Sequence, residues 1–288
     1  MTDEHKLIGL IGVNIGGSLS PALHEDAFAA AGVAGHYHLM DAGQPQRRLD
    51  ELLAAVRLAG FSGVNITFPF KEAVIPLLDE VSAEAAEIGA VNTVVIDKAG
   101  RMTGHNTDRL GFRGAFQSEL GAESVRDKPV LLLGAGGAGR AVAFALMDLG
   151  TGLLRIHDIE PARAAGLSAD LAKRFGAGRS DVVRDPQAAV ASVAAIVNAT
   201  PIGMLGHPGL PLATGAITAR HVVADVVYTP LETAFLGAAR AQGARGMGGA
   251  GMCVHQAVEA FRLFTGRTAD LDRMHKIFGE AAARRDKT

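Results

Sequence analysis

The chain has 288 residues, 48% of them hydrophobic and 20% charged, a composition typical of a globular protein large enough for two domains. Its formal net charge is only -2, with no long run of one sign, so nucleic acid and membrane surfaces are poor partners and small molecules are favoured. The single cysteine, Cys253, excludes an intrachain disulfide, and the most apolar region, 130–149, is broken by glycines and an arginine. We therefore expect a cytoplasmic protein without a membrane span.

Short β-branched runs alternate with alanine-rich helical patterns along almost the whole chain. This alternation predicts an α/β protein with parallel sheets covered by helices. The helical pattern is clearest at Leu49, Leu52, Leu53 and Val56, which have the i, i+3, i+4, i+7 spacing of an amphipathic helix. The predicted strands cover residues 7–13, 36–40, 63–67, 130–133, 153–158, 194–198 and 221–227.

Two stretches rich in glycine or polar residues are candidate breaks in this pattern. The first, 121–128, follows a helix predicted over residues 107–120, and the second, 243–251, precedes another strong helical pattern. The last helices could therefore return to the first domain. We predict an open, mostly parallel α/β substrate-binding and catalytic domain from residues 1–107 plus 251–288. The remaining residues, 108–250, would form a Rossmann-type NAD-binding domain.

The segment GAGGAG at residues 134–139 follows a buried strand pattern and precedes a helical one, the context in which GxGxxG binds a dinucleotide. The first glycine makes a tight turn, the second lets the backbone approach a pyrophosphate, and the third lets helix and strand pack closely. The helix N-terminus adds N–H groups and the positive end of its dipole. The residues of this predicted cradle are Gly134, Gly136, Gly137, Ala138 and Gly139.

Asp158 follows the last of these glycines by about 20 residues, where the fingerprint expects an acid. A carboxylate there can accept hydrogen bonds from the adenosine ribose and repel a 2′-phosphate, which favours NAD over NADP. Asp158 could also cap the next helix, whose first turn contains Pro161, and both roles can coexist. Arg163 could instead pair with a phosphate, which would favour NADP.

The first half carries polar residues in unusual places. Ser18 and Ser20 precede a helical pattern and could either cap it or grip a carboxylate or polyol. Asn65 and Thr67 share one face at the end of a strand pattern, and Lys71 follows a Phe-Pro-Phe turn, where a solvated lysine would be unremarkable. Two more polar side chains, each beside a threonine, can be interpreted as turn or cap chemistry; they are Asn92 and Asp108.

Several segments, in order along nearly the whole chain, resemble the shikimate and quinate dehydrogenase family: GSLSPALH, NITFPFK, GAVNTVV, GHNTD, GAGGAGRAV, VNATPIGM, DVVYTP and HQAVEAFRLFTG. The resemblance is greatest to the NAD-dependent quinate/shikimate dehydrogenases. Members that use the phosphorylated cofactor usually carry an Asn-Arg-Thr cluster where this chain has Asp158-Ile159-Glu160.

The resemblance implies that Lys71 and Asp108 are the catalytic pair, which handles the hydroxyl proton while hydride passes to the nicotinamide. It implies substrate binding by Ser18, Ser20, Asn65, Thr67, Asn92, Gln256 and, near the nicotinamide, Tyr228. It implies further cofactor contacts at Thr200, Val227 and Gly249. No metal is required, and the 10 histidines form no HExxH pattern.

Gln256 can also be placed from the helical pattern around it. Val254, Ala257, Val258 and Phe261 form an apolar stripe, and Gln256 lies off that stripe. The pattern alone favours solvent exposure of this amide, whereas the resemblance implies that it faces a cleft.

The resemblance, together with the glycine cradle and Asp158, implies an NAD-dependent oxidoreductase that reversibly oxidises the ring C3 hydroxyl of shikimate, quinate or both to the 3-dehydro ketone. We expect a role in quinate catabolism and aromatic compound metabolism, and a monomer or homodimer. Two residues depart from the family's common pattern: Gly17 replaces a histidine and Arg109 replaces a glycine. The alternatives are an NADPH-dependent biosynthetic shikimate dehydrogenase, an aminoshikimate dehydrogenase, and a non-catalytic dinucleotide sensor.

Overall fold

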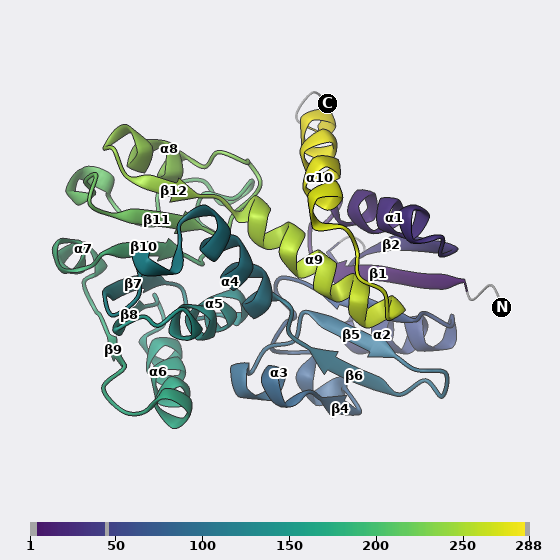
Figure 1. Cartoon of the computed structure of the whole chain (residues 1–288). Coiled ribbons are helices and arrows are strands. Elements are labelled where there is room, and N and C mark those ends of the chain that lie inside the picture. Colours follow the sequence, from purple (N-terminus) through teal and green to yellow (C-terminus); the bar gives the residue numbers. More distant parts are fainter. Residues whose placement is uncertain (1–4, 44–45, 286–288) are drawn as a thin grey trace. The chain divides into compact units, whose positions relative to one another are not determined.

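The computed structural model describes residues 5–43 and 46–285, and the chain divides into two compact units (Figure 1). Unit 1 is formed by residues 1–107 and 254–288, and unit 2 by residues 108–253. Helix α9 (Gly249–Thr265) begins in unit 2 and ends in unit 1. The stretch 121–128, a candidate break in the sequence pattern, lies inside unit 2. The Arg245 side chain ties it down by donating to the Leu120 carbonyl and the Ser124 hydroxyl.

Unit 1 is built around a mixed sheet with strand order β2-β1-β3-β5-β6-β4. Strand β1 pairs in parallel with β2 and β3, and β4 pairs in parallel with β6, whereas β5 runs antiparallel to both of its neighbours. Its elements are β1 (Lys6–Gly12), α1 (Ser20–Ala31), β2 (Gly35–Asp41), α2 (Leu49–Leu58), β3 (Gly63–Ile66), β4 (Glu80–Val81), α3 (Ala83–Ile88), β5 (Thr93–Ile96), β6 (Met102–His105), the greater part of α9, and α10 (Leu271–Arg285).

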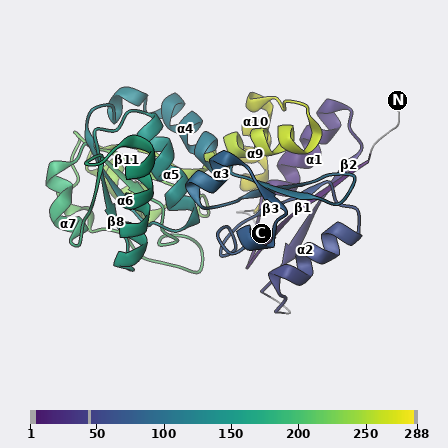
Figure 2. The same cartoon turned by 90° about the horizontal axis from the view of Figure 1, so that it is seen from below.

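Helices cover both faces of this sheet (Figure 2). On one face, α2 buries the predicted stripe that begins at Leu49 and ends at Val56, and these side chains pack against Ile11 and Val64 of the strands. On the other face, α1 packs against α9 and α10, with the rings of Phe28 and Phe261 5.4 Å apart. The predicted amphipathic helix is therefore confirmed, and the C-terminal helices do pack on the first sheet.

His24 of α1 lies inside this aromatic layer. Its ring stacks on Tyr37 at 4.7 Å, Phe261 and Phe264 are next to it, and only 1% of the residue is exposed. Its Nδ1 is buried without a hydrogen-bond partner. Burial disfavours the charged imidazolium and lowers the pKa of His24 from 6.5 to about 3.

This depressed pKa predicts a loss of stability in acid that replacement of His24 should remove. Between pH 6.5 and 3 the unfolded chain binds one more proton at this residue than the folded chain, so stability falls as pH falls. The slope is about 1.4 kcal/mol per pH unit. His24→Phe, which keeps an aromatic ring against Tyr37, should gain roughly 2 kcal/mol over the wild type between pH 7 and pH 5. Urea unfolding at both pH values measures this gain.

The exposed His38 of β2 provides the control for that measurement. His38→Gln should leave the wild-type pH dependence unchanged. An equal stability difference between His24→Phe and the wild type at both pH values would contradict the prediction.

Unit 2 contains a fully parallel sheet with strand order β12-β11-β10-β7-β8-β9. The chain starts at the central strand β7, runs outward to β9, and returns to β10 on the other side of β7, which is the Rossmann-type order. Its elements are α4 (Asp108–Glu119), β7 (Pro129–Leu133), α5 (Gly137–Asp148), β8 (Leu153–His157), α6 (Pro161–Phe175), β9 (Ser180–Val182), α7 (Pro186–Ala189), β10 (Ala195–Asn198), β11 (Val222–Asp225), α8 (Ala234–Ala241) and β12 (Arg245–Met247).

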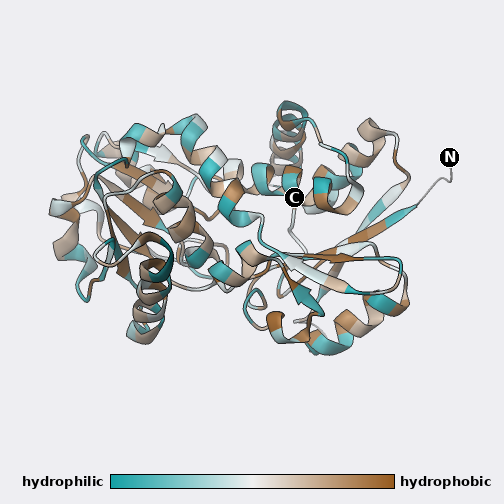
Figure 3. Ribbon diagram, turned by 60° about the horizontal axis from the view of Figure 1, so that its bottom comes forward, coloured by the Kyte–Doolittle hydropathy of each residue, from teal (hydrophilic) through white to brown (hydrophobic). Residues whose placement is uncertain are grey.

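Apolar strand residues lie between the helices of each unit (Figure 3). In unit 2, Leu131, Ile196 and Val223 pack against Phe235 and Leu236 of α8. No helix in the described part of the chain is long and apolar enough to cross a membrane. The mixed α/β fold with a Rossmann-type second unit is therefore as predicted.

Every predicted strand is present, with ends that differ by one or two residues. The largest difference is at β11, which was expected to reach residue 227 and ends at Asp225. There the Asp225 carboxylate accepts the N–H of Val227 at 3.0 Å and turns the chain away from the sheet. Five short strands were not predicted: β4, β5, β6, β9 and β12.

Candidate active site

The polar residues of unit 1 gather because strand ends meet at one edge of its sheet. Strands β1 and β3 are parallel, and the Thr67 N–H just beyond β3 donates to the Ile11 carbonyl at 3.0 Å. The antiparallel strand β5 begins at this edge, so Asn92 lies beside Ile66, whose N–H donates to the Asn92 carbonyl at 2.8 Å. Strand β6 ends at the same edge, where His105 pairs with Thr93. This is the position at which α/β sheets bind small molecules.

Asn92 is the centre of a buried hydrogen-bond chain at this edge. Its Oδ1 accepts the main-chain N–H of Thr107 at 2.8 Å, which fixes the amide orientation because an N–H can only donate. Its Nδ2 therefore donates to the Thr107 hydroxyl at 2.9 Å, and that hydroxyl donates to Gln256 Oε1 at 3.2 Å. The donors of the Gln256 amide are then on Nε2. Gln256 is thus half-buried against polar partners. Its place off the apolar stripe had suggested solvent exposure, and that expectation is wrong.

Asn65 continues this chain into the core. Its Nδ2 donates to the Asn92 carbonyl at 3.2 Å and to the Thr93 hydroxyl at 3.0 Å, and its Oδ1 accepts the Tyr37 hydroxyl at 2.9 Å. The Thr93 hydroxyl in turn donates to Asn92 Oδ1 at 3.0 Å. With 7% of the residue exposed and both amide hydrogens used within the protein, Asn65 mainly holds β3 against β5 and orients Asn92.

Ser18 and Ser20 lie where the chain leaves β1 and enters α1. The Ser18 hydroxyl donates to the Ser20 hydroxyl at 3.2 Å and accepts the Ser20 N–H at 3.3 Å. The residue before α1 is Leu19, which makes no side-chain cap, so the Ser18 contact reaches only the first N–H of the helix, and both hydroxyls are half-buried and close together. The neighbouring Gly17 is exposed, and an added Cβ would meet nothing within 4 Å. A side chain at position 17 would have room beside the two serines.

Lys71 is placed by backbone contacts on both sides of the β3 end. The Phe70 N–H donates to the Thr67 carbonyl at 2.9 Å, and the Lys71 carbonyl accepts the Val91 N–H at 2.8 Å, one residue before Asn92. Lys71 is half-buried, and Phe68 in the preceding turn is 55% exposed. The VNITFPFK stretch therefore carries Thr67 and Lys71 along the edge that also holds Asn92.

In unit 2 the glycines after β7 divide into two kinds. An added Cβ on Gly134, whose φ is +97°, would lie 2.9 Å from the Ala199 carbonyl oxygen, and one on Gly139 would lie 2.1 Å from the Gly134 oxygen. These two glycines are required by the chain's own packing. At Gly136 the nearest atom to an added Cβ is Arg163 Nη1 at 3.6 Å, so the space over the N-terminus of α5 is open. That open space fits the approach of a pyrophosphate to the backbone.

Asp158 lies at the end of β8, next to this cradle. Its Oδ2 accepts the Ala135 N–H at 2.7 Å and its Oδ1 accepts the Glu160 N–H at 2.8 Å. Each carboxylate oxygen can accept a second hydrogen bond. Asp158 thus shapes both the glycine loop and the turn into α6. Arg163, on the first turn of α6, pairs with Glu160 at 3.2 Å.

A buried carboxylate holds the loops that follow β10 and β11. Asp225 accepts the Asn198 amide at 2.9 Å and the Thr233 hydroxyl at 2.7 Å, and Asn198 Oδ1 accepts the Thr200 N–H at 3.0 Å. Burial raises the pKa of Asp225 and its hydrogen bonds oppose that rise. The next residues along the β11 loop are Val227, which is buried, and Tyr228, which is half-buried. The network keeps both loops at the carboxyl end of the unit 2 sheet.

Gly249 opens α9 beside these loops. Its N–H donates to the Val227 carbonyl at 3.2 Å, and an added Cβ would lie 2.2 Å from the Val226 oxygen. Packing of the chain alone therefore requires glycine at this position. Asp108 is buried at the first position of α4, and Arg109 follows it.

Two family models match the chain: the shikimate dehydrogenase substrate binding domain over residues 10–94 and the shikimate 5′-dehydrogenase C-terminal domain over residues 249–277. The quinate/shikimate dehydrogenase (NAD(+)) of Corynebacterium efficiens is 46% identical over 96% of this chain and 99% of its own. The shikimate dehydrogenase (NADP(+)) of Streptomyces avermitilis is 46% identical over 98% of each chain. The chain belongs to the shikimate dehydrogenase family.

A solved structure agrees with this membership of the shikimate dehydrogenase family. The quinate dehydrogenase from Corynebacterium glutamicum in complex with NAD has 43% sequence identity and a TM-score of 0.87, and the match covers 96% of this chain and 100% of that chain. The family predicted from the ordered segments is therefore confirmed.

Within unit 1, the predicted substrate residues Asn92 and Gln256 share one hydrogen-bond network, and Thr67 lies at the same strand edge, whereas Ser18 and Ser20 lie on the segment that leads from β1 into α1. Sequence reasoning did not assign a role to Thr107, Thr93 or Tyr37, although Thr107 joins Asn92 to Gln256. A signal was present: the dipeptide Asn-Thr occurs at both 92–93 and 106–107. The structural role of Asp225 was also not predicted, because an acid at the end of a strand is typical of an ordinary turn.

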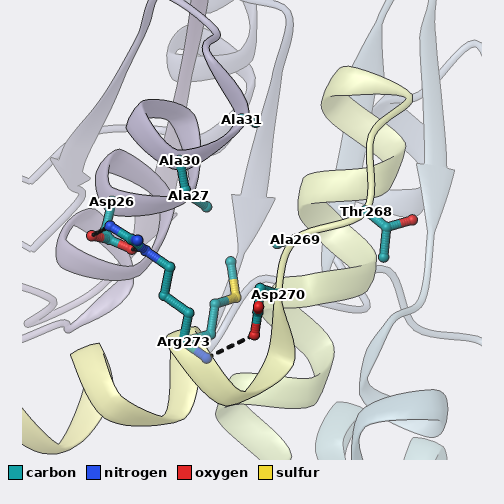
Figure 4. A pocket seen from close by; sticks show the side chains of 9 residues that line it. Asp26, Ala27, Ala30, Ala31, Thr268, Ala269, Asp270 and Arg273 are labelled. Atoms are coloured by element: carbon teal, nitrogen blue, oxygen red, sulfur yellow. Dashed lines mark hydrogen bonds and ion pairs between the residues drawn. The ribbon is translucent and has the colours of Figure 1, made fainter.

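A pocket of about 150 Å³ between α1 and α10 contains none of the predicted site residues (Figure 4). Alanines form much of its wall, and Arg273 beside it is paired with Asp26 at 2.6 Å, so its guanidinium is already neutralised. Across residues 5–43 and 46–285, no group of three or more His, Cys, Asp or Glu side chains is arranged to hold a metal ion.

Proposed function

We propose that the protein is an NAD-dependent dehydrogenase that reversibly oxidises the ring C3 hydroxyl of shikimate, quinate or both to the 3-dehydro ketone. The observation that carries this proposal is the oriented chain from Asn92 through Thr107 to Gln256, at the strand edge that also bears Lys71. A network of oriented amides and hydroxyls at a strand edge supports a site for a polyhydroxylated ring acid. Relatives with these two substrates in their names support the choice.

Substrate binding is assigned to unit 1. The paired hydroxyls of Ser18 and Ser20 would bind the carboxylate, and Thr67, Asn92 and the Nε2 of Gln256 would bind ring hydroxyls. Tyr228 of unit 2 would add a hydroxyl near the nicotinamide. Asn65 would act indirectly, because its amide hydrogens already orient Asn92 and Thr93.

The proton is assigned to Lys71 and Asp108 as the catalytic pair. Oxidation of a secondary alcohol requires a base for the hydroxyl proton, and the same group returns it in the reverse direction. Lys71 provides an amine at the substrate edge, and Asp108 provides a buried carboxylate at the start of α4. In this assignment Lys71 exchanges the proton, and Asp108 is the second member of the pair.

Cofactor binding is assigned to unit 2, and NAD when bound would supply the hydride acceptor. The open space over Gly136 fits the pyrophosphate, and Asp158 fits the ribose. The other cofactor residues would be Gly134, Gly137, Ala138, Gly139, Arg163, Thr200, Val227 and Gly249. We further propose a cytoplasmic monomer or homodimer that acts on a small molecule.

NADP is the second candidate cofactor, and one observation favours it. Arg163 Nη1 reaches to within 3.6 Å of the Cβ position of Gly136, so the first turn of α6 offers a guanidinium close to the cradle. The NADP(+) relative is as similar as the NAD(+) relative, at 46% identity. The carboxylates of Asp158 and Glu160 nevertheless oppose a 2′-phosphate, which makes NAD the better choice.

The test is a four-way comparison of initial rates of nicotinamide reduction at alkaline pH, with shikimate or quinate and with NAD or NADP. We expect turnover with NAD at a kcat/KM at least about tenfold above that with NADP. Turnover with NADP alone would reject the cofactor assignment. An inert protein in all four reactions would reject the proposed substrates and favour an amino-substituted substrate or a dinucleotide sensor.

A further inference from the structure

Arg109, the residue after Asp108, makes a two-point contact with a carboxylate. Its Nε and Nη2 donate to the two carboxylate oxygens of Asp148, each at 2.7 Å, and its guanidinium lies over the Phe144 ring at 5.3 Å from the centroid. The side chains of Arg109 and Asp148 are 9% and 16% exposed. This parallel, two-point geometry is the strongest that an arginine and a carboxylate can form, and a lysine could not reproduce it.

The Arg109–Asp148 pair joins helix α4 to helix α5. Arg109 is the second residue of α4, directly after Asp108, and Asp148 is the last residue of α5. The negative end of the α5 dipole disfavours a carboxylate at that position, so Asp148 depends on the cation beside it. The opposite end of α5 forms the glycine cradle. The pair therefore ties the beginning of α4 to the helix on which the dinucleotide would be seated.

The pair with Asp148 lies at the first turn of α4. The first N–H groups of a helix have no partners within it, and terminal turns fray. Asp108 also lies where the chain passes from one unit to the other. Thr107 before it is held by Asn92 within unit 1, and Arg109 after it is held by Asp148 within unit 2. The residue directly after Asp108 is thus fixed to the C-terminal end of α5.

We propose that Arg109 is a positioning residue, which holds Asp108 in one orientation relative to the cofactor cradle through its pair with Asp148. The inference rests on the proposed function, because it gives Arg109 a role only through Asp108. It accounts for an arginine where the family usually has a glycine.

The test compares Arg109→Gln with Arg113→Gln. Arg113 lies one turn further along α4, 3.8 Å from the same Asp148 carboxylate, and is 43% exposed, so it is a matched control. Arg109→Gln should lower kcat by about 10- to 100-fold, the size expected for misplacement of a reacting group, with the Kd of NAD changed by less than about threefold. Arg113→Gln should stay within about twofold of the wild type. Asp148→Asn should match Arg109→Gln, and the double variant should add little to either.

A double-mutant cycle of Arg109→Gln with Asp108→Asn separates a positioning role of Arg109 from a merely structural one. In an Asp108→Asn background the carboxylate that Arg109 positions is gone, so Arg109→Gln should change kcat by less than about threefold there. If the fall in kcat is as large in that background as in the wild type, the inference is wrong. It is also wrong if Arg109→Gln retains wild-type kcat in an enzyme that turns over.

The outcomes also distinguish this inference from the proposed function. A wild type that turns over neither substrate with either cofactor overturns both, whereas wild-type turnover with an unchanged Arg109→Gln variant overturns the inference alone. If Arg109→Gln does not fold, Arg109→Lys replaces it, since lysine keeps the charge and loses the two-point geometry. The same fall in kcat is then expected.

Discussion

Replacement of Lys71 by methionine should lower kcat for shikimate or quinate oxidation by about 10²- to 10⁴-fold, the usual contribution of a positioned acid–base group. Substrate Kd should change by less than about tenfold, because Ser18, Thr67 and Asn92 would still bind the ring acid. Methionine keeps the length and apolar stem of the lysine, so packing behind the Phe-Pro-Phe turn is preserved. Steady-state kinetics give kcat, and equilibrium titration of the variant with substrate gives Kd separately.

Two further variants sharpen this test of Lys71. Lys71→Arg retains the positive charge but cannot give up a proton, so it should be as inactive as the methionine variant. Lys98→Met, on the exposed turn between β5 and β6, should retain wild-type kcat. A fall of only a few-fold in Lys71→Met, or an active Lys71→Arg, would remove Lys71 from the proton-transfer step.

Asp158→Ala should raise the ratio of kcat/KM with NADP to that with NAD by about 10- to 100-fold. Loss of the carboxylate removes repulsion of the 2′-phosphate together with a ribose acceptor, a difference of about 1.4 to 2.8 kcal/mol. The ratio must be measured because Asp158 also accepts the Ala135 N–H in the cradle, so its loss should weaken both cofactors. Initial rates with each cofactor, at saturating substrate, give the two constants.

Glu160 provides a graded comparison for Asp158. Glu160→Gln should release Arg163 from its 3.2 Å ion pair and raise the same ratio by a smaller factor, because the guanidinium can then approach a phosphate. Asp185→Ala, which removes an exposed carboxylate that caps α7, should leave the ratio unchanged. An unchanged ratio in Asp158→Ala would place cofactor selection elsewhere in the chain.

Local patterns carried much of the prediction in unit 2. The glycines of 134–139, the apolar strand before them and the acid at Asp158 are close in sequence, and each has its own steric or electrostatic reason, so spacing alone predicted the cradle. Gly136 illustrates this most clearly. Packing of the chain does not require a glycine at this position, because the space beside it is open. The β5–β6 hairpin was missed because the run from Thr93 to His105 is short, interrupted by a charged turn and only partly alternating.

Long-range contacts account for what could not be predicted. The bond from Thr107 to Asn92 spans 15 residues and depends on β6 lying antiparallel to β5, a pairing that no local pattern specifies. The pair of Arg109 with Asp148 spans 39 residues, so nothing near Arg109 in the sequence indicated its partner. Gln256 illustrates the same limit, because its helical phase predicted exposure and its polar neighbours come from two other segments.

The discontinuity of unit 1 has a consequence for synthesis of the protein on the ribosome. Residues 1–107 emerge first, but the layer that covers α1 includes Phe261 and Phe264 of α9, which are translated after all of unit 2. Unit 2 is continuous and can fold as soon as it leaves the exit tunnel. The nascent α1 and the strands beneath it meanwhile expose an apolar face to other chains and to chaperones. We therefore expect residues 1–107 to aggregate when the chain is truncated before α9. Unit 2 expressed by itself should remain soluble.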